Sequence, residues 1–169
     1  MLEIINNLSP FFEDCYRRIN VREYARKIKI SPPTASKLLS VYHREGFLKK
    51  ESYKNYILFY SNKESREFIE LSKIYWGIRL TDIVEFLNKK LTNPTIVLFG
   101  SLAKAETKED SDIDIALFSI EREINLKDFE KKLKRKIQLF WFDSIKGIRN
   151  DELANNIING HILKGRLRL

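Results

Sequence analysis

The chain has 169 residues, of which 43% are hydrophobic, and it carries a formal net charge of +8 at neutral pH. This length suits one ordinary domain or two small ones, each with a hydrophobic core. Cys15 is the only cysteine, which excludes an internal disulfide framework, and no stretch is long and apolar enough to span a membrane.

Two features bear on the cellular compartment. Residues 1–6 lack the basic and then apolar layout of a signal peptide, and a single cysteine fits a reducing environment. Two histidines and one cysteine cannot build a structural zinc site. We therefore expect a cytoplasmic protein that has no membrane partner.

Three helices are expected in the first part of the chain. Residues 2–16 are predicted to form a helix or a helix pair, interrupted near Ser9-Pro10. A short amphipathic helix follows over 21–28. Ser31 is then a cap residue followed by two prolines, and the next helix is expected over 34–45, with its apolar side chains on one face.

Gly46 ends that helix, and residues 47–50 and 56–60 are expected to form two strands around a turn. The positive charge is concentrated in this part of the chain. Residues 17–54 contain eleven Lys or Arg against three Glu, a surplus of eight that equals the net charge of the whole chain. Such a basic surface favours nucleic acid as a partner.

Helix, turn, helix and hairpin in this order resemble the winged helix-turn-helix domains of bacterial and archaeal regulators, over roughly residues 15–61. The residues that carry the resemblance are Val21, Ala25, Ser31, Thr34, Ala35, Ser36, Gly46, Phe47 and Leu48. In that family the second helix lies in the DNA major groove, and the wing touches the backbone or the minor groove.

The resemblance implies two groups of DNA contacts. Residues facing base edges or phosphates would be Ser31, Thr34, Ser36 and Lys37. Salt-dependent attraction to the DNA backbone would come from Arg44, Lys49, Lys50 and Lys54. The alternative is a winged helix that serves as a protein-docking or dimer module.

A helical connector is expected next. Ser61 and Glu64 have capping-box spacing, which predicts a helix over 63–76, and after Gly77 a second helix is expected over 81–90. These helices would connect the two modules, and the first either packs within the chain or gives a homodimer interface.

Beyond Asn93-Pro94 an acidic pair follows a Gly-Ser turn. The strand expected over 95–99 breaks at Gly100-Ser101, and after a polar loop Ser111-Asp112-Ile113-Asp114 opens a second strand. Strict alternation places Asp112 and Asp114 on one face of that strand. Because adjacent carboxylates repel each other, the usual reason for such a pair is a divalent cation, here Mg²⁺ carrying the phosphates of a nucleotide.

Gly100 would let the backbone approach a ligand, and the N–H groups after it would meet a phosphate at the start of a short helix. The acidic pair has two other possible interpretations. One is a calcium loop, but such a loop needs glycine at its sixth position, where this chain has Ile115. The other is a solvated acidic turn without a ligand.

The last elements are a helix over 126–136 and a strand over 137–142. The helix has a basic face that is either solvated or holds a polyanionic substrate. Its residues are Lys127, Lys131, Lys132, Lys134, Arg135 and Lys136.

Gly100-Ser101, nine residues and then Ser111-Asp112-Ile113-Asp114 resemble the pattern of minimal nucleotidyltransferases (MNT type) of the DNA polymerase beta superfamily. The resemblance covers nearly all of residues 95–165. It includes the closing helix and G-x-x-L of residues 152–163, in which His161 is expected to be an ordinary packing or surface residue.

The resemblance implies a site. Asp112 and Asp114 would be catalytic and would hold Mg²⁺ or Mn²⁺, and the NTP, expected to be ATP, would be bound by Gly100, Ser101, Lys104 and Ser111. Lys104-Ala105 stands where Arg-Gly is common, which keeps the charge but loses the flexible glycine. Relatives of this type are often antitoxins that modify a HEPN-type protein, which implies such a partner.

One position departs from the pattern. In active relatives a third carboxylate, on the strand after the basic helix, helps to hold a second metal and to activate the attacking hydroxyl. Gln138 stands there, and its amide can ligate weakly but carries no charge and cannot act as a general base. Asp143 would take the role only if the strand were bulged or the matching shifted.

The expected fold class is α+β, with a winged helix-turn-helix over 1–61, a helical connector over 62–92 and a small mixed-sheet nucleotidyltransferase domain over 93–169. The enzyme hypothesis is nucleotidyl transfer from an NTP to a protein or nucleic-acid hydroxyl, with catalytic competence left open by Gln138. The alternative is a DNA-binding regulator whose degenerate domain only binds nucleotide or a partner protein. A third hypothesis treats both modules as protein-docking surfaces.

Overall fold

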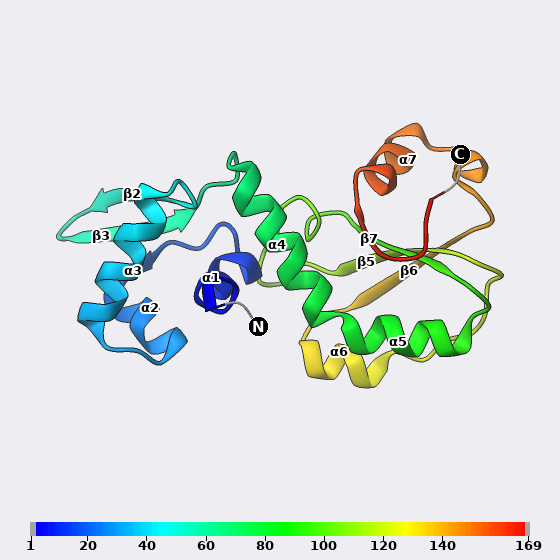
Figure 1. Cartoon of the computed structure of the whole chain (residues 1–169), viewed down its shortest axis with the longest axis horizontal. Coiled ribbons are helices and arrows are strands. Elements are labelled where there is room, and N and C mark those ends of the chain that lie inside the picture. Colours follow the sequence, from blue (N-terminus) through cyan, green and yellow to red (C-terminus); the bar gives the residue numbers. More distant parts are fainter. Residues whose placement is uncertain (1–2, 168–169) are drawn as a thin grey trace. The chain divides into compact units, whose positions relative to one another are not determined.

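The computed structural model describes residues 3–167 and has mixed α+β architecture (Figure 1). The chain divides into two compact units. The first unit holds the chain up to Tyr75 together with Ala105–Glu109, and the second holds Trp76–Lys104 and the chain from Asp110 onward. None of the helices formed by the described residues has the length and apolar character needed to cross a bilayer.

The first unit combines helices with a three-stranded antiparallel sheet. Its elements are α1 (Glu3–Glu13), β1 (Ile19–Asn20), α2 (Val21–Ile28), α3 (Pro32–Arg44), β2 (Leu48–Tyr53), β3 (Tyr56–Ser61) and most of α4 (Arg66–Arg79). The sheet has the strand order β1-β3-β2. Two helices followed by a hairpin were expected from the sequence, and the assignment to the winged-helix class stays a prediction.

Helix α1 contains Pro10 yet is one continuous helix, so the expected interruption near Ser9-Pro10 was wrong. Proline has no N–H to donate to the carbonyl four residues earlier, which here belongs to Asn6. The Ser9 hydroxyl donates to that same carbonyl at 2.7 Å and so satisfies it. The helix buries an apolar face made of Ile5, Leu8, Phe11 and Phe12.

Side-chain caps fix the start of α3. Ser31 Oγ accepts a hydrogen bond from the Thr34 N–H at 3.3 Å, as a cap residue does. The helix starts at Pro32, two residues before the expected start, because proline is favourable in a first turn. The hairpin strands are longer than expected, since the turn between them consists of only Lys54 and Asn55, with Lys54 at φ +51°.

The expected capping box before α4 was wrong. Ser65, not Ser61, caps this helix, because its Oγ accepts from the Phe68 N–H at 3.2 Å. Ser61 belongs to β3, and its hydroxyl donates to the Phe11 carbonyl at 3.1 Å. The helix therefore begins at Arg66, later than predicted.

Helix α4 continues through Gly77, where the sequence analysis expected it to have ended. A β-carbon at Gly77 would lie 3.1 Å from Nε2 of His161 and 3.9 Å from a Leu163 methyl group. The missing side chain thus lets the helix lie close to these two residues. Gly77 serves packing here and does not terminate the helix.

Residues Ala105–Glu109 complete the first unit. The Cys15 N–H donates to the Thr107 carbonyl at 2.8 Å, and Arg17 forms an ion pair with Glu109 at 2.6 Å. Cys15 and Thr107 are buried, and burial raises the pKa of the Cys15 thiol to about 11. The thiol is therefore a protonated packing group at neutral pH.

The second unit is built on a four-stranded mixed sheet. Besides the end of α4, its elements are α5 (Thr81–Lys90), β4 (Thr95–Phe99), β5 (Ile113–Phe118), α6 (Lys127–Leu133), β6 (Ile137–Phe142), a 3-10 turn η1 (Ile145–Gly147), α7 (Asp151–Ile158) and β7 (His161–Lys164). The strand order is β6-β5-β4-β7. Only the β5–β6 pair is parallel.

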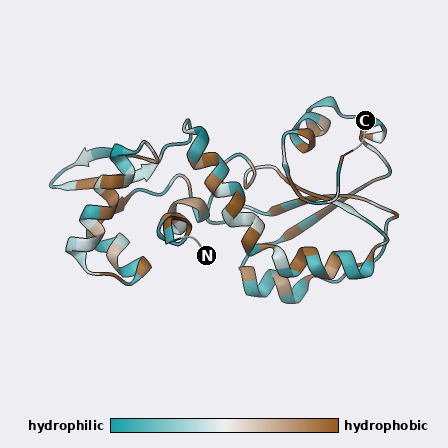
Figure 2. Cartoon of the chain, in the orientation of Figure 1, coloured by the Kyte–Doolittle hydropathy of each residue, from teal (hydrophilic) through white to brown (hydrophobic). Residues whose placement is uncertain are grey.

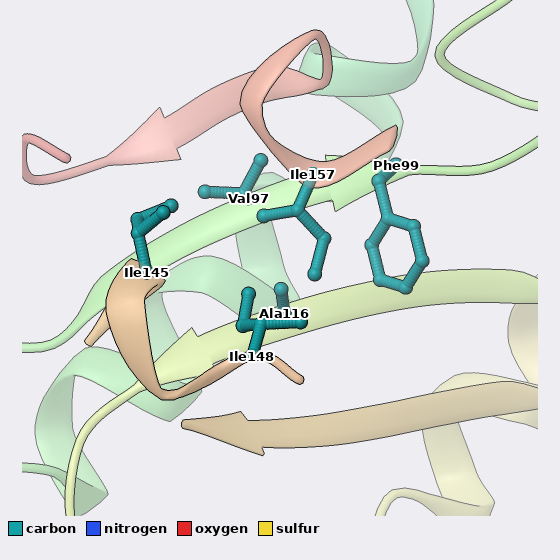
Figure 3. Packing of buried hydrophobic residues seen from close by; sticks show 6 residues of the cluster. All are labelled: Val97, Phe99, Ala116, Ile145, Ile148 and Ile157. Carbon is teal, nitrogen blue, oxygen red and sulfur yellow. The ribbon is translucent and has the colours of Figure 1, made fainter. Parts of the chain in front are cut away.

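One face of this sheet packs against α7 and η1. Figure 3 shows side chains from β4 and β5 meeting Ile157 of α7 and Ile145 of η1, and the six buried residues of this cluster are Val97, Phe99, Ala116, Ile145, Ile148 and Ile157. The strands of the sheet are mostly hydrophobic in Figure 2. Asp114 lies two residues before Ala116 and so on the same face, next to this core.

The helix expected over 126–136 ends early, and the closing segment holds a strand that was not predicted. Helix α6 stops at Leu133 because Lys134 adopts a left-handed backbone conformation, with φ +54°. The segment over 152–163, expected to hold the closing helix and the G-x-x-L, consists of α7 followed by the strand β7. Gly160 makes this strand possible, since a β-carbon there would lie 2.6 Å from the Leu98 carbonyl oxygen.

Candidate active site

The two carboxylates lie at the start of β5. Asp112 immediately precedes the strand and Asp114 is its second residue, while Ile113 and Ile115 between and after them are buried. Both aspartates are half-buried. The alternation expected from the sequence is therefore present, and the two carboxylates share one side of the strand.

Gly100 lies directly against Asp114. It follows β4, whose last residue, Phe99, pairs with Asp114. A β-carbon at Gly100 would lie only 2.4 Å from Asp114 Oδ2, and the residue has φ +73°. Both the space and the backbone conformation therefore require glycine at this position.

The segment after Gly100 is a turn, and the short helix expected there does not form. Ser101 is half-buried, and its carbonyl accepts from the Lys104 N–H at 3.3 Å. Ala105, which stands where the resemblance has a glycine, adopts φ +54°. The chain thus keeps a glycine-like backbone conformation at this position without the glycine.

Lys104 is exposed, and its Nζ donates to Oδ1 of Asn156 at 2.5 Å. Asn156 lies on α7, far from the acidic pair in the sequence. Nothing in the sequence predicts this contact, because an asparagine on a helix gives no sign of its partner. This hydrogen bond orients the one lysine expected to bind phosphate.

Ser111 is held by an arginine that the sequence analysis grouped with a solvated or substrate-binding basic face. Arg135 Nη1 donates to the Ser111 carbonyl at 2.7 Å, and its guanidinium lies 5.3 Å from the centre of the Trp76 ring. Arg135 is half-buried, unlike the neighbouring Lys134. It therefore braces the residue that precedes Asp112.

Gln138 occupies the position beside the acidic pair. In the parallel pairing of β5 and β6 it is in register with Asp114, and its Nε2 donates to Oδ2 of Asp112 at 2.6 Å. The register is regular from Ile113 to Phe118. Asp143 follows the far end of β6, so the bulge that would have placed it beside the aspartates is absent.

The electrostatics of the pair follow from its surroundings. Burial, and then the negative charge of Asp112, raise the pKa of the Asp114 carboxyl. The two aspartates beside the Gly100 backbone fit a single divalent cation with oxygen ligands. Within residues 3–167, no three His, Cys, Asp or Glu side chains group closely enough to hold a metal ion together.

The α3 residues expected to face DNA lie on its exposed side. Thr34, Ser36 and Lys37 are exposed, and Ser31 and Thr34 are hydrogen-bonded to each other through their hydroxyls at 2.8 Å. Lys37 forms no ion pair with any residue that the structure describes. It is the α3 cation best suited to meet a phosphate.

The other basic residues of the first unit differ in their partners. Arg44 pairs with Glu45 at 3.2 Å, and Lys49 pairs with Glu64 at 2.7 Å. Lys50 and Lys54 are exposed on the hairpin. Surface pairs of this kind are weak, at about 0–1 kcal/mol, but each partly neutralises the cation that a phosphate would meet.

Two exposed groups of side chains on the same unit were not predicted from the sequence. Tyr53 and Tyr56 flank the hairpin turn and are each 58% exposed, with Lys54 Nζ 5.4 Å from the centre of the Tyr53 ring. Helix α2 exposes Arg22, Arg26 and Lys27. The charge count over 17–54 had included these cations without placing them.

Comparisons with known proteins bear on the second unit. A family model described as Polymerase beta, Nucleotidyltransferase matches residues 81–167, just over half of the chain. Searches of curated proteins and of solved structures found no match. The matched segment contains the Gly-Ser turn, both aspartates and Gln138. The chain is therefore a member of the polymerase beta nucleotidyltransferase family.

Proposed function

We propose that the protein transfers a nucleotidyl group from an NTP, ATP being the expected donor, to a hydroxyl on a protein or nucleic acid. The observation that carries the proposal is the placement of Asp112 and Asp114 on one side of β5 against Gly100, inside the segment that matches the family. Two carboxylates beside a glycine, whose backbone no side chain covers, suit the binding of a cation and of a phosphate chain.

The reaction exchanges a phosphoanhydride linkage of the NTP for a phosphodiester linkage to the acceptor. The acceptor oxygen forms a bond to the α-phosphorus, the bond from that phosphorus to the β-phosphate oxygen breaks, and pyrophosphate leaves. Bound Mg²⁺ or Mn²⁺ supplies Lewis-acid stabilisation of the phosphate charge. Asp112 and Asp114 are the residues that would hold it.

The remaining residues bind and orient. The backbone groups of Gly100 and Ser101 lie next to the aspartates and would contact the phosphates. Lys104, which is oriented by Asn156, would supply a positive charge for the phosphates. Ser111 is fixed through its carbonyl by Arg135. Gln138 cannot accept the proton of the acceptor hydroxyl, so that proton passes to solvent. The absence of a general base predicts transfer about 10²–10⁴-fold slower than with a carboxylate there.

A second candidate function is nucleotide binding without transfer. It is favoured by the hydrogen bond from Gln138 to Asp112, since an amide stands where a base is needed and one aspartate is engaged with it. The domain would then sense nucleotide or hold a partner protein, and the chain would act as a regulator.

The proposal for the first unit is DNA binding. It is supported by the exposed side chains of Ser36 and Lys37 on α3 and of Lys50 and Lys54 on the hairpin. Protein docking, including a HEPN-type partner or a second copy of the chain, is the competing proposal. A cytoplasmic location suits all of these.

The test is binding of ATP with Mg²⁺, followed by transfer of label from α-³²P-labelled ATP to protein or nucleic acid. Wild type is compared with Asp112→Asn and Asp114→Asn. Asp128→Asn is the matched control, because it removes the same charge from a side chain that is 98% exposed. Binding and transfer lost in the first two variants but kept in the control support the enzyme.

Binding without label transfer in wild type, with transfer gained in Gln138→Asp, supports the second candidate. If wild type binds no more nucleotide than Asp112→Asn, the site assignment fails for both.

A further inference from the structure

We infer that this site binds its nucleotide with one divalent cation instead of two, because the Gln138 amide stands where the charge needed for a second cation would have to be. The inference rests on the proposed nucleotide site and concerns its stoichiometry. It starts from a hydrogen bond, the donation of Gln138 Nε2 to Asp112 Oδ2 at 2.6 Å.

The first step is the number of charges. Two-cation sites place two divalent ions about 3.5–4 Å apart, so they need several anionic ligands that bridge or flank both ions. Here Asp112 and Asp114 are the only two carboxylates on this side of β5, and no third acidic side chain joins them among residues 3–167. The protein side chains therefore supply the charge that balances one divalent ion, and none that would hold a second beside it.

The second step is the character of the neighbouring group. An amide N–H₂ donates hydrogen bonds, so its positive end already faces the Asp112 oxygen that a second cation would have to share. Gln138 is in register with Asp114 on the adjacent strand, and it is held there by the backbone pairing of β5 and β6. The amide thus takes part of the role of a cation at Asp112.

The third step is the consequence for binding order. With one of its two carboxylates engaged by the amide, the site attracts a free cation weakly. The cation is then expected to enter together with the triphosphate, which supplies the additional anionic oxygens. One cation per nucleotide follows.

The experiment is equilibrium dialysis of the full chain with Mn²⁺ and α,β-methylene ATP, in which the bond that would break is replaced. Manganese and nucleotide retained with the protein are both measured against the outer chamber, so complexes free in solution cancel. Wild type is compared with Gln138→Glu, which keeps the side-chain shape and adds one charge. Gln138→Ala and Gln138→Asp are run alongside, and Gln138 is exposed, so these variants are expected to fold.

We expect one Mn²⁺ per retained nucleotide in wild type and Gln138→Ala, and a twofold rise to two in Gln138→Glu or Gln138→Asp. Two ions per nucleotide in wild type would overturn the inference and leave the proposed function standing. A ratio that stays at one in both Gln138→Glu and Gln138→Asp would also overturn the inference and leave the proposed function standing. Retention of nucleotide no greater than in Asp112→Asn would overturn the proposed function, and the inference with it.

Discussion

Gly100 and Asp114 lie so close together that a β-carbon at Gly100 would be 2.4 Å from the Asp114 carboxylate oxygen. The glycine therefore has two separate reasons to be there, its φ of +73° and the space taken by the aspartate. Gly46 has only the first, because it has φ +80° and no atom within 4 Å of a β-carbon. Substitutions at Gly100 and Gly46 therefore allow the cost of backbone strain to be measured separately from the cost of the steric clash.

Gly100→Ala is expected to lower the free energy of unfolding by about 2–5 kcal/mol, the sum of left-handed backbone strain and overpacking. Gly46→Ala should cost about 1–2 kcal/mol, from backbone strain alone. Urea denaturation of both variants measures this difference. Nucleotide binding should be lost only in Gly100→Ala, and equal costs for the two variants would contradict the close contact.

The raised pKa of Asp114 predicts a pH-dependent stability. In the folded, metal-free protein this carboxyl binds a proton more readily than in the unfolded chain, so the free energy of unfolding falls as the pH rises from 3.8, its ordinary pKa, through the folded value. Asp114→Asn removes this loss and is expected to raise the free energy of unfolding at neutral pH. The gain should shrink as the pH approaches 3.8.

Thermal unfolding over a pH series without metal measures this, with Asp128→Asn as the control that should show no gain. Adding ATP and Mg²⁺ should stabilise wild type and not Asp114→Asn. If Asp114→Asn is less stable than wild type at neutral pH, then the aspartate is held by favourable contacts instead.

Arg135 holds the carbonyl of Ser111, the residue that precedes Asp112. Arg135→Ala removes a charged hydrogen bond to the Ser111 carbonyl and the stacking on Trp76, for an expected loss of about 2–3 kcal/mol in stability. Lys131→Ala, at a side chain that is 81% exposed, is the matched control and should cost under about 0.5 kcal/mol.

A purely structural role for Arg135 would change stability alone. A role in placing Ser111 should also weaken Mg²⁺–ATP binding at a temperature where the variant is fully folded. Calorimetric titration distinguishes the two, and affinity equal to that of wild type would remove Arg135 from the site.

The Ser9 hydroxyl substitutes for the N–H that Pro10 lacks. Ser9→Ala should therefore cost about 1 kcal/mol in the natural chain, the usual value of a hydrogen bond. In the Pro10→Ala background the alanine placed at position 10 can donate to Asn6 itself, and the cost should fall to near zero. Denaturation of the two single variants and the double variant measures this coupling, and additive effects would exclude it.

The ion pairs predict which basic residues contribute most to the salt dependence of DNA binding. Lys37→Ala should reduce the slope of log affinity against log salt by about 0.9, the value for one lost phosphate contact. Lys49→Ala should change it less, because Glu64 already pairs with this lysine. Fluorescence anisotropy with a duplex over a salt series gives both slopes, and Lys131→Ala is the control. Binding that is insensitive to salt would favour the protein-docking alternative.

Three of the four strands of the second unit, β4, β5 and β6, were predictable because their patterns are local. Strands β4 and β6 and helix α5 have the predicted bounds, and the alternation around Asp112 placed both carboxylates on one side. The register that brings Gln138 beside Asp114 depends on the pairing of two strands about 25 residues apart in the sequence, and a family resemblance was needed to anticipate it.

The features that the sequence analysis missed depend on contacts between distant segments. Ser61 and Ser65 are equally good cap residues in the sequence, and only the extension of β3 to Ser61 decides between them. Gly77 looks like a helix end until His161 is known to lie against it. Arg135 sits in a run of lysines, and no local signal distinguishes the one cation that reaches Ser111.

Ala105–Glu109 has a consequence for how the protein is made. The first unit needs the Thr107 carbonyl for the Cys15 N–H and Glu109 for Arg17, and both come well after Tyr75 in the chain. During synthesis this unit cannot be complete until the ribosome has passed Glu109, by which time β4 and the Gly100 turn have also been made. A fragment that stops at Tyr75 would leave a buried residue, Cys15, without its backbone partner, so no single cut in the chain yields both units intact.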